Sequence, residues 1–190
     1  VWSEIRSDLE SKKTMSSLLQ GDVGSGKTVV AALSLLETLA NGYQGIFMAP
    51  TEILAEQHYL NFKELFNDFN FNIQLLTGSL KKSVREKIEK NIEKGEIDLI
   101  IGTHALFQES IDYDNPGLVV IDEQHRFGVE QRHSLKEKGD NPDLLIMTAT
   151  PIPRSMAMLI YGDLDLSVID EMPPGRKVIA TFWRRENRRK

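Results

Sequence analysis

Residues 21–28 read Gly-Asp-Val-Gly-Ser-Gly-Lys-Thr and match the phosphate-binding pattern G-x-x-x-x-G-K-[ST] at every position. Glycines let backbone N–H groups turn inward around an anion, and the N-terminus of a following helix adds partial positive charge. The lysine can reach the β- and γ-phosphates, and the threonine hydroxyl can ligate Mg²⁺. We expect a nucleotide site made by Gly21, Asp22, Val23, Gly24, Ser25, Gly26, Lys27 and Thr28.

An acidic pair supplies the second part of such a site. Asp122 and Glu123 directly follow the apolar run at 118–121. If that run is a strand of a parallel sheet, Asp122 reaches the same sheet edge as Thr28 and can hold Mg²⁺ with it. Glu123 would then orient and deprotonate an attacking water, which favours hydrolysis over transfer to another substrate. We expect Lys27, Asp122 and Glu123 to be catalytic, the alternative being two solvated turn residues.

Polar residues around this site are candidates for coupling it to a moving surface. Gln124 and His125 follow the acidic pair and can sense the γ-phosphate. Thr148 and Thr150 follow another apolar run and place two hydroxyls on a tight turn. The alternative for the two threonines is capping of the helix that follows.

Three more loops should share that edge. They read Pro-Thr-Glu at 50–52, Thr-Gly-Ser at 77–79 and Gly-Thr-His at 102–104. Each offers hydroxyls and backbone amides, which suit phosphate oxygens, although each could equally be a helix cap. The residues that offer these groups are Thr51, Thr77, Gly78, Thr103 and His104.

Apolar runs alternating with helical patterns must position these residues. Strands are expected at 17–20, 45–49, 73–77, 98–101, 118–121 and 144–147, with less regular ones at 166–169 and 178–180. Helices are expected at 2–9, after the glycine loop to about 41, at 52–66, at 80–94 and at 154–161. Continuous apolar strands alternating with helices predict an α/β fold with a parallel β-sheet covered by helices on both faces.

For two of these helices, the pattern of apolar residues predicts which face is buried. Thr51 should cap the helix at 52–66. Its expected buried residues are Ile53, Leu54, Tyr59, Leu60 and Phe62. The helix at 80–94 should lie on the surface and end at Gly95. Its apolar residues recur every four positions, at Leu80, Val84, Ile88 and Ile92.

Composition fits one soluble domain of 190 residues, with 41% hydrophobic and 27% charged residues. Cysteine is absent, so disulfides and thiolate metal sites are excluded, and no leader or membrane span is apparent. These features fit a cytoplasmic protein.

The formal net charge of −5 argues that any nucleic-acid contact is local. The basic segment at 184–190 fits a solvated end or linker better than a binding patch.

Taken together, the motifs resemble the first RecA-like domain of a superfamily-two helicase over nearly the whole chain. The segments that carry the resemblance are residues 21–28, 49–58, 121–129 and 147–155. Asp-Glu-Gln-His at 122–125 and Pro-Pro-Gly-Arg at 173–176 favour the RecG type over the related transcription-repair coupling translocases. The fold implied is a RecA-like P-loop NTPase domain, and the family implied is that of bacterial ATP-dependent DNA helicases.

The resemblance implies ATP and Mg²⁺ as cofactors and branched double-stranded DNA, such as replication forks and Holliday junctions in recombination and repair, as substrate. It gives Thr148 and Thr150 a coupling role, and makes Gln124 and His125 contacts to a partner domain. It assigns to DNA-facing loops the residues Thr51, Thr77, Gly78, Thr103 and His104. Residues 1–176 would be the ATP-binding domain and 177–190 the start of a linker to a second motor domain. That domain, which supplies an arginine finger, and a DNA-wedge domain are absent from this sequence, so the fragment alone should have little ATPase activity.

Two alternatives remain open. One is the motor domain of a transcription-repair coupling translocase. The other is a nucleotide-binding switch or docking module that does not hydrolyse its nucleotide. Glu123 separates the enzyme from the switch, because a carboxylate beside the metal ligand serves water activation.

Overall fold

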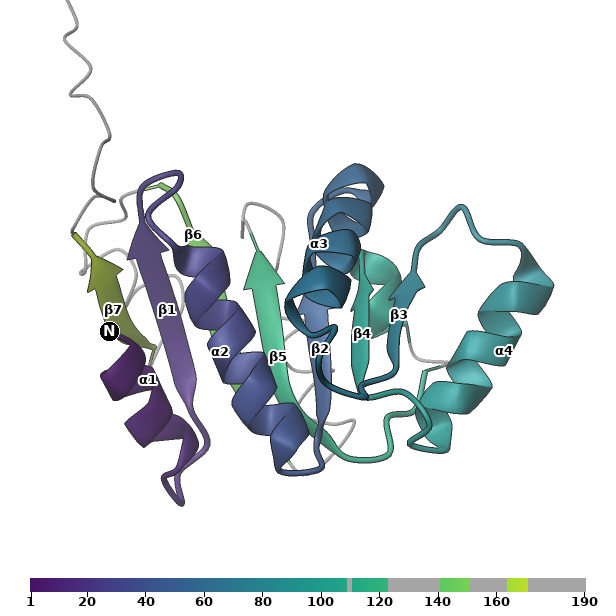
Figure 1. Cartoon of the computed structure of the whole chain (residues 1–190), viewed down its shortest axis with the longest axis horizontal. Helices are drawn as coiled ribbons and strands as arrows, with labels where there is room; N and C mark the ends of the chain where they lie inside the picture. Colours follow the sequence, from purple (N-terminus) through teal and green to yellow (C-terminus); the bar gives the residue numbers. More distant parts are fainter. Residues whose placement is uncertain (109–110, 123–140, 151–163, 171–190) are drawn as a thin grey trace, which may run out of the picture.

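A computed structural model of the chain describes residues 1–108, 111–122, 141–150 and 164–170 (Figure 1). The described strands form a seven-stranded sheet with the order β3-β4-β2-β5-β6-β1-β7, in which every pair is parallel. The parallel α/β prediction is therefore confirmed. The strands are β1 (Ser16–Gly21), β2 (Gln44–Met48), β3 (Ile73–Leu76), β4 (Leu99–Gly102), β5 (Pro116–Asp122), β6 (Asp143–Thr148) and β7 (Asp165–Ile169).

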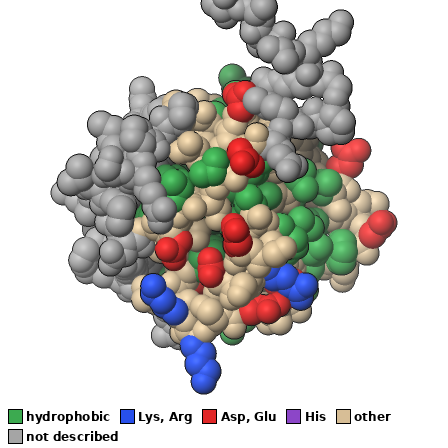
Figure 2. All heavy atoms as spheres, turned by 90° about the vertical axis from the view of Figure 1, so that its left-hand side faces the viewer, with side chains coloured by type: hydrophobic (Ala, Val, Ile, Leu, Met, Phe, Trp, Pro, Cys, Tyr) green, Lys and Arg blue, Asp and Glu red, His purple; other side chains and the backbone are tan. Residues whose placement is uncertain are grey.

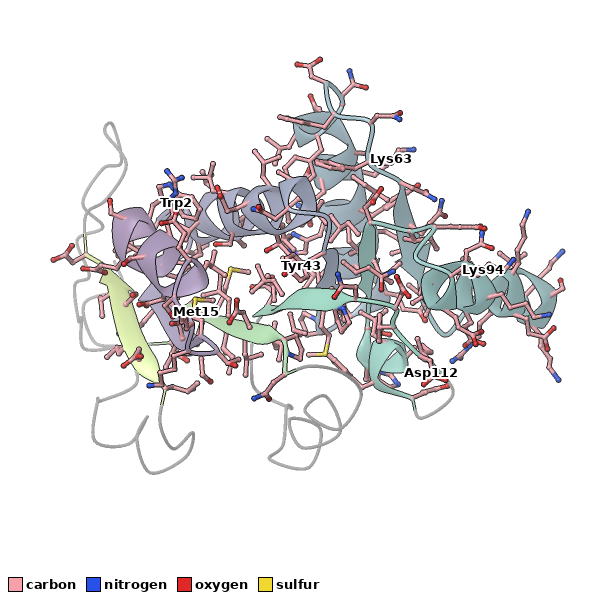
Figure 3. The ribbon with its side chains drawn as sticks, turned by 90° about the horizontal axis from the view of Figure 1, so that it is seen from below. Trp2, Met15, Tyr43, Lys63, Lys94 and Asp112 are labelled. Carbon is pink, nitrogen blue, oxygen red and sulfur yellow. The ribbon has the colours of Figure 1, made fainter. Side chains whose placement is uncertain are left out.

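Helices lie on both faces of this sheet (Figure 3). They are α1 (Trp2–Leu9), α2 (Lys27–Ala40), α3 (Glu52–Leu65), α4 (Lys82–Glu93) and the short 3₁₀ helix η1 (His104–Phe107). Successive strand residues point to opposite faces. Leu19 accordingly packs with α1, α2 and α3, whereas its neighbour Leu18 belongs to the cluster that includes α4 and η1. The two apolar clusters fix the sheet between its helix layers.

The predicted buried face of α3 is partly wrong. Ile53 and Leu60 are 78% and 65% exposed, whereas the buried residues are Ala55, His58 and Phe62. Positions 53 and 60 are two turns apart on one face, and 55 lies about 200° away from 53 around the helix. The face that packs against the sheet carries one small side chain, Ala55, and the rings of His58 and Phe62, although the opposite face carries branched aliphatic side chains. Leu54 and Tyr59 are partly buried, as expected.

The expected surface helix α4 is present, and Gly95 ends it with a φ of +67°. Ile92 is fully buried, and Leu80 and Ile88 are partly buried against the core. Val84 is 44% exposed, so it is the member of the stripe that turns away from the core. None of the helices in the described part of the chain has the length and apolar character that a membrane span needs. The predicted helix at 154–161, the strand at 178–180 and the proposed boundary at 176 lie outside the described residues.

Candidate nucleotide site at the carboxyl edge of the sheet

The glycine loop joins the end of β1 directly to α2, as the pattern predicts. Gly24 and Gly26 have φ values of +77° and +99°, a left-handed region that other residues enter at a cost. Gly21 is favoured for a different reason, because a Cβ there would lie 2.5 Å from Ser25 Oγ and 3.2 Å from Ile169 Cβ. These glycines let the chain turn tightly from β1 into α2.

Lys27, the first residue of α2, reaches back across this loop. Its Nζ donates hydrogen bonds to the backbone oxygens of Gly21 at 2.8 Å and Asp22 at 3.0 Å. An ammonium group has three N–H donors, so one remains for a phosphate oxygen while the other two hold the side chain over the loop. These two bonds hold the Lys27 ammonium group over the glycine loop, at the N-terminus of α2.

The loop has polar groups that suit an anion. Ser25 Oγ is buried, and no partner for it is present among the described residues. Within the described chain, no side chain caps the first turn of α2. A buried hydroxyl without a partner is costly, and uncapped N–H groups at a helix start attract phosphate. These observations fit a nucleotide phosphate at residues 21–28.

Strand order brings the predicted metal and coupling residues toward the loop. Strand β6 lies between β1 and β5, so Thr148 pairs with Gln20 at the end of β1, and Met147 pairs with Asp122 at the end of β5. Thr28 begins α2 just after the loop. The donor chemistry of Thr28 and Asp122, one hydroxyl and one carboxylate, fits Mg²⁺ with nucleotide oxygens completing its shell.

The threonine turn after β6 is internally bonded. The Oγ1 atoms of Thr148 and Thr150 are 2.9 Å apart, and the Thr150 N–H donates to Thr148 Oγ1 at 3.2 Å. Thr148 is buried and Thr150 exposed. The turn therefore links the interior of the edge to its surface. Glu123, Gln124 and His125, the other predicted catalytic and coupling residues, lie outside the described residues.

A histidine contacts Asp122. His58 Nε2 lies 2.9 Å from Asp122 Oδ2, and the two side chains are 10% and 15% exposed. The imidazole belongs to α3, and its centroid lies 4.6 Å from that of Phe47 on β2. The sequence reasoning included His58 in the motif at 49–58 but gave it no role. A polar ring on the helical face shared by Ala55 and Phe62 was the signal that could have revealed it.

The three predicted DNA-facing loops follow adjacent strands, because β2, β4 and β3 are neighbours. Thr51 caps α3 by accepting a hydrogen bond from the Leu54 N–H at 3.3 Å. Glu52 Oε1 accepts one from the Ser79 N–H at 3.1 Å, which joins the first two loops. The Ala49 N–H donates to Gly102 O at 2.8 Å, which ties the third loop to the first.

The predicted DNA contacts in these loops fall into a buried group and an exposed group. Thr77 and Thr103 are 2% and 3% exposed, and Thr77 Oγ1 is bonded to Ser79 Oγ at 3.1 Å. Thr51, Gly78 and His104 are exposed. A surface ligand can therefore reach the last three directly, whereas the two buried hydroxyls shape the loops from within.

The surface at α1 and β7 differs in charge from what a phosphate backbone requires. The end of the molecule made by α1 and β7 carries more acidic than basic side chains among its described residues (Figure 2). Such a surface repels a phosphate backbone. At the carboxyl edge of the sheet, the loop amides and Lys27 are the groups that can bind phosphates.

Comparison with known proteins shows the family of this chain. The sequence matches the family "DEAD/DEAH box helicase" over residues 4–159. The chain belongs to the DEAD/DEAH box helicase family. In this DEAD/DEAH box protein, the matched range includes the glycine loop, Asp122 and the three loops just described.

Individual relatives are close in sequence. The chain is 57% identical over 180 residues to the ATP-dependent DNA helicase RecG of Streptococcus pneumoniae, covering 95% of this chain and 26% of that protein. It is 58% identical over 179 residues to RecG of Thermotoga maritima, covering 94% of this chain and 23% of that one. The predicted resemblance to RecG-type helicases is confirmed. The chain spans about a quarter of the length of these relatives.

A solved structure shows the same fold. The structure of RecG bound to a three-way DNA junction superposes with a TM-score of 0.80 at 55% identity. The match covers 92% of this chain and 23% of that chain. The seven-stranded parallel sheet is therefore the RecA-like arrangement that the sequence motifs predicted.

Proposed function

We propose that this chain is the first RecA-like motor domain of an ATP-dependent DNA helicase that remodels branched DNA in recombination and repair. One observation carries the proposal. The glycine loop and Asp122 lie at the same sheet edge as the joined loops after β2, β3 and β4. A nucleotide site and a DNA-facing surface on one edge allow ATP-driven movement to reach DNA. The RecG relatives and the RecG structure with a three-way junction support branched DNA as the substrate.

ATP would bind with its phosphates at residues 21–28. Lys27 would donate to the phosphates, and Thr28 and Asp122 would hold Mg²⁺, which would supply positive charge beside the phosphate oxygens. Glu123 orients the attacking water and accepts its proton. Gln124, His125, Thr148 and Thr150 report nucleotide state to the neighbouring surfaces.

The loops at 50–52, 77–79 and 102–104 would follow the DNA backbone. Their exposed groups contact phosphates without reading bases, which suits a motor that moves along any sequence. ATP would bind in the cleft between this domain and a second RecA-like domain. The cleft would close on ATP and reopen after hydrolysis, and this cycle would move the loops along the duplex. A DNA-wedge domain of the same protein would hold the junction.

The isolated domain should hydrolyse ATP very slowly. An arginine finger from a partner domain raises turnover by about 10³–10⁵-fold in P-loop enzymes where it has been measured. That the chain spans about a quarter of the length of its relatives agrees with a role as one lobe of a larger motor.

The test is a steady-state ATPase and unwinding assay on the full-length protein with a three-way junction, with linear duplex as the reference. We expect junction-stimulated turnover that Lys27→Ala lowers by about 10²–10³-fold, since one electrostatic contact to the reacting group is lost. Glu123→Gln should keep ATP binding but stop hydrolysis. Unchanged turnover in Glu123→Gln would instead support a nucleotide-binding switch, and stimulation by RNA polymerase in place of junctions would support a transcription-repair translocase.

A further inference from the structure

His58 is the described side chain that contacts the carboxylate predicted to hold Mg²⁺. The Nε2–Oδ2 distance of 2.9 Å to Asp122 is that of a charge-assisted hydrogen bond, and both side chains are largely shielded from water. The ring is held from its other sides by Phe47 and Phe62, whose centroids lie 4.6 and 6.2 Å from its own. The imidazole is therefore fixed in position before any ligand arrives.

The surroundings of His58 define which nitrogen carries the proton toward Asp122. Nδ1 is buried, and no partner for it is present in the described part of the chain. A hydrogen on Nδ1 alone would leave a buried donor unsatisfied and would set the Nε2 lone pair against a carboxylate oxygen. The tautomer with N–H at Nε2 avoids both costs, so His58 donates and Asp122 accepts.

We propose that His58 is a positioning residue for the metal-binding carboxylate. Its Nε2–H holds Asp122 Oδ2 and leaves Oδ1 as the oxygen available to a nucleotide-bound Mg²⁺. Hydrogen bonds to ligating carboxylates fix the orientation of the ligand, and their loss costs metal affinity. The inference rests on the proposed function, because it takes Asp122 as a Mg²⁺ ligand.

Helix α3 gives this contact a further consequence. Glu52 at the start of the same helix holds the Ser79 N–H, and His58 lies six positions later, about 9 Å along the axis. One rigid helix therefore contacts both the metal carboxylate and the loop predicted to face DNA. Helix α3 therefore joins the two halves of the sheet edge, through Glu52 at its start and His58 six positions later.

The test is a Mg²⁺ titration of fluorescent ADP binding to the full-length protein, with ADP affinity in EDTA as the metal-free reference. His58→Asn places its amide near the Nδ1 position, too short to reach Asp122. We expect the Mg²⁺ midpoint to rise by about 10–100-fold, with affinity in EDTA unchanged. His58→Gln places an N–H donor near the Nε2 position and should restore the midpoint to within about threefold of wild type.

Asn61→Ala, an exposed change on the same helix, is the matched control, and the unfolding midpoint of each variant without nucleotide reports folding. A His58→Asn variant that melts lower but keeps the wild-type Mg²⁺ midpoint would overturn the proposal. Equal shifts in His58→Asn and His58→Gln would also overturn it, because they would assign the effect to ring packing. A wild-type protein that binds ADP equally well with and without Mg²⁺ would instead contradict the proposed Mg²⁺ site, and one that binds no ADP would contradict the proposed function.

Discussion

Glu52 and Ser79 join two loops that are far apart in the sequence: Glu52 Oε1 accepts the Ser79 N–H at 3.1 Å. A Cβ on Gly78 would lie 3.2 Å from the same oxygen, so the carboxylate packs closely on the loop. The contact orders the loop after β3 from the first turn of α3. It gives Glu52 a role in shaping the surface predicted to face DNA, although its charge by itself repels phosphates.

Glu52→Ala should weaken duplex DNA binding of the full-length protein by about tenfold, because the hydrogen bond that orders the Ser79 loop is lost. Glu52→Gln keeps an oxygen acceptor and should bind nearly as well as wild type. Fluorescence anisotropy at fixed salt measures both, with Glu56→Ala, an exposed change one turn later, as the control. Tighter DNA binding by Glu52→Ala would show that the charge outweighs the ordering.

Thr148→Val tests the coupling turn, because valine keeps the buried shape and removes the hydroxyl bonded to Thr150. We expect a loss of about 0.5–1.5 kcal/mol in the free energy of unfolding. Basal ATP turnover should change little, whereas the number of base pairs unwound per ATP should fall. Parallel phosphate-release and strand-separation assays give this ratio. An unchanged ratio would leave the turn with a structural role alone.

Gly102→Ala should destabilise the fold, because a Cβ there would lie 2.1 Å from the backbone oxygen of Leu76. Neither strand can move away without breaking the β3–β4 ladder, so we expect a loss of about 1–3 kcal/mol from overpacking. Gly42→Ala is the comparison, since its Cβ meets open space and only its φ of +80° is strained. Urea unfolding measures both. A smaller loss at Gly102 than at Gly42 would contradict the close-approach argument.

Asp143 predicts a pH dependence of stability. Burial, the largest effect, raises its pKa from the ordinary value of 3.8, and Asp8 adds to the rise, while the Met15 N–H opposes it. The folded chain therefore binds this proton more tightly than the unfolded chain does. As the pH rises from the pKa of Asp143 in the unfolded chain through its pKa in the folded chain, the free energy of unfolding falls. Above the pKa of the folded chain, this loss of stability is constant.

Asp143→Asn keeps an oxygen that can accept the Met15 N–H, but it cannot ionise. The stability of this variant relative to wild type should therefore increase with pH across the acidic range and then become constant. Urea unfolding at a series of pH values measures the difference. A difference that does not change with pH would contradict the raised pKa.

The sequence by itself determined the glycine loop, the order of strands and helices along the chain, and the family. These features are local: residues 21–28 carry their own turn chemistry, and a continuous apolar run such as 118–121 indicates a buried strand wherever it pairs. Thr51 and Gly95 also act as the helix cap and stop that their types predict, because capping involves only near neighbours.

Only the tertiary structure decided which residues meet across the sheet. The insertion of β6 between β1 and β5 brings Thr148 between the glycine loop and Asp122, and a linear pattern does not encode that order. The buried face of α3 was likewise fixed by the fit of Ala55, His58 and Phe62 to the sheet, although Ile53 and Leu60 are more apolar than His58. His58 reaches Asp122 because packing brings together positions separated by 64 residues, and the energy of that contact exists only once the sheet has formed.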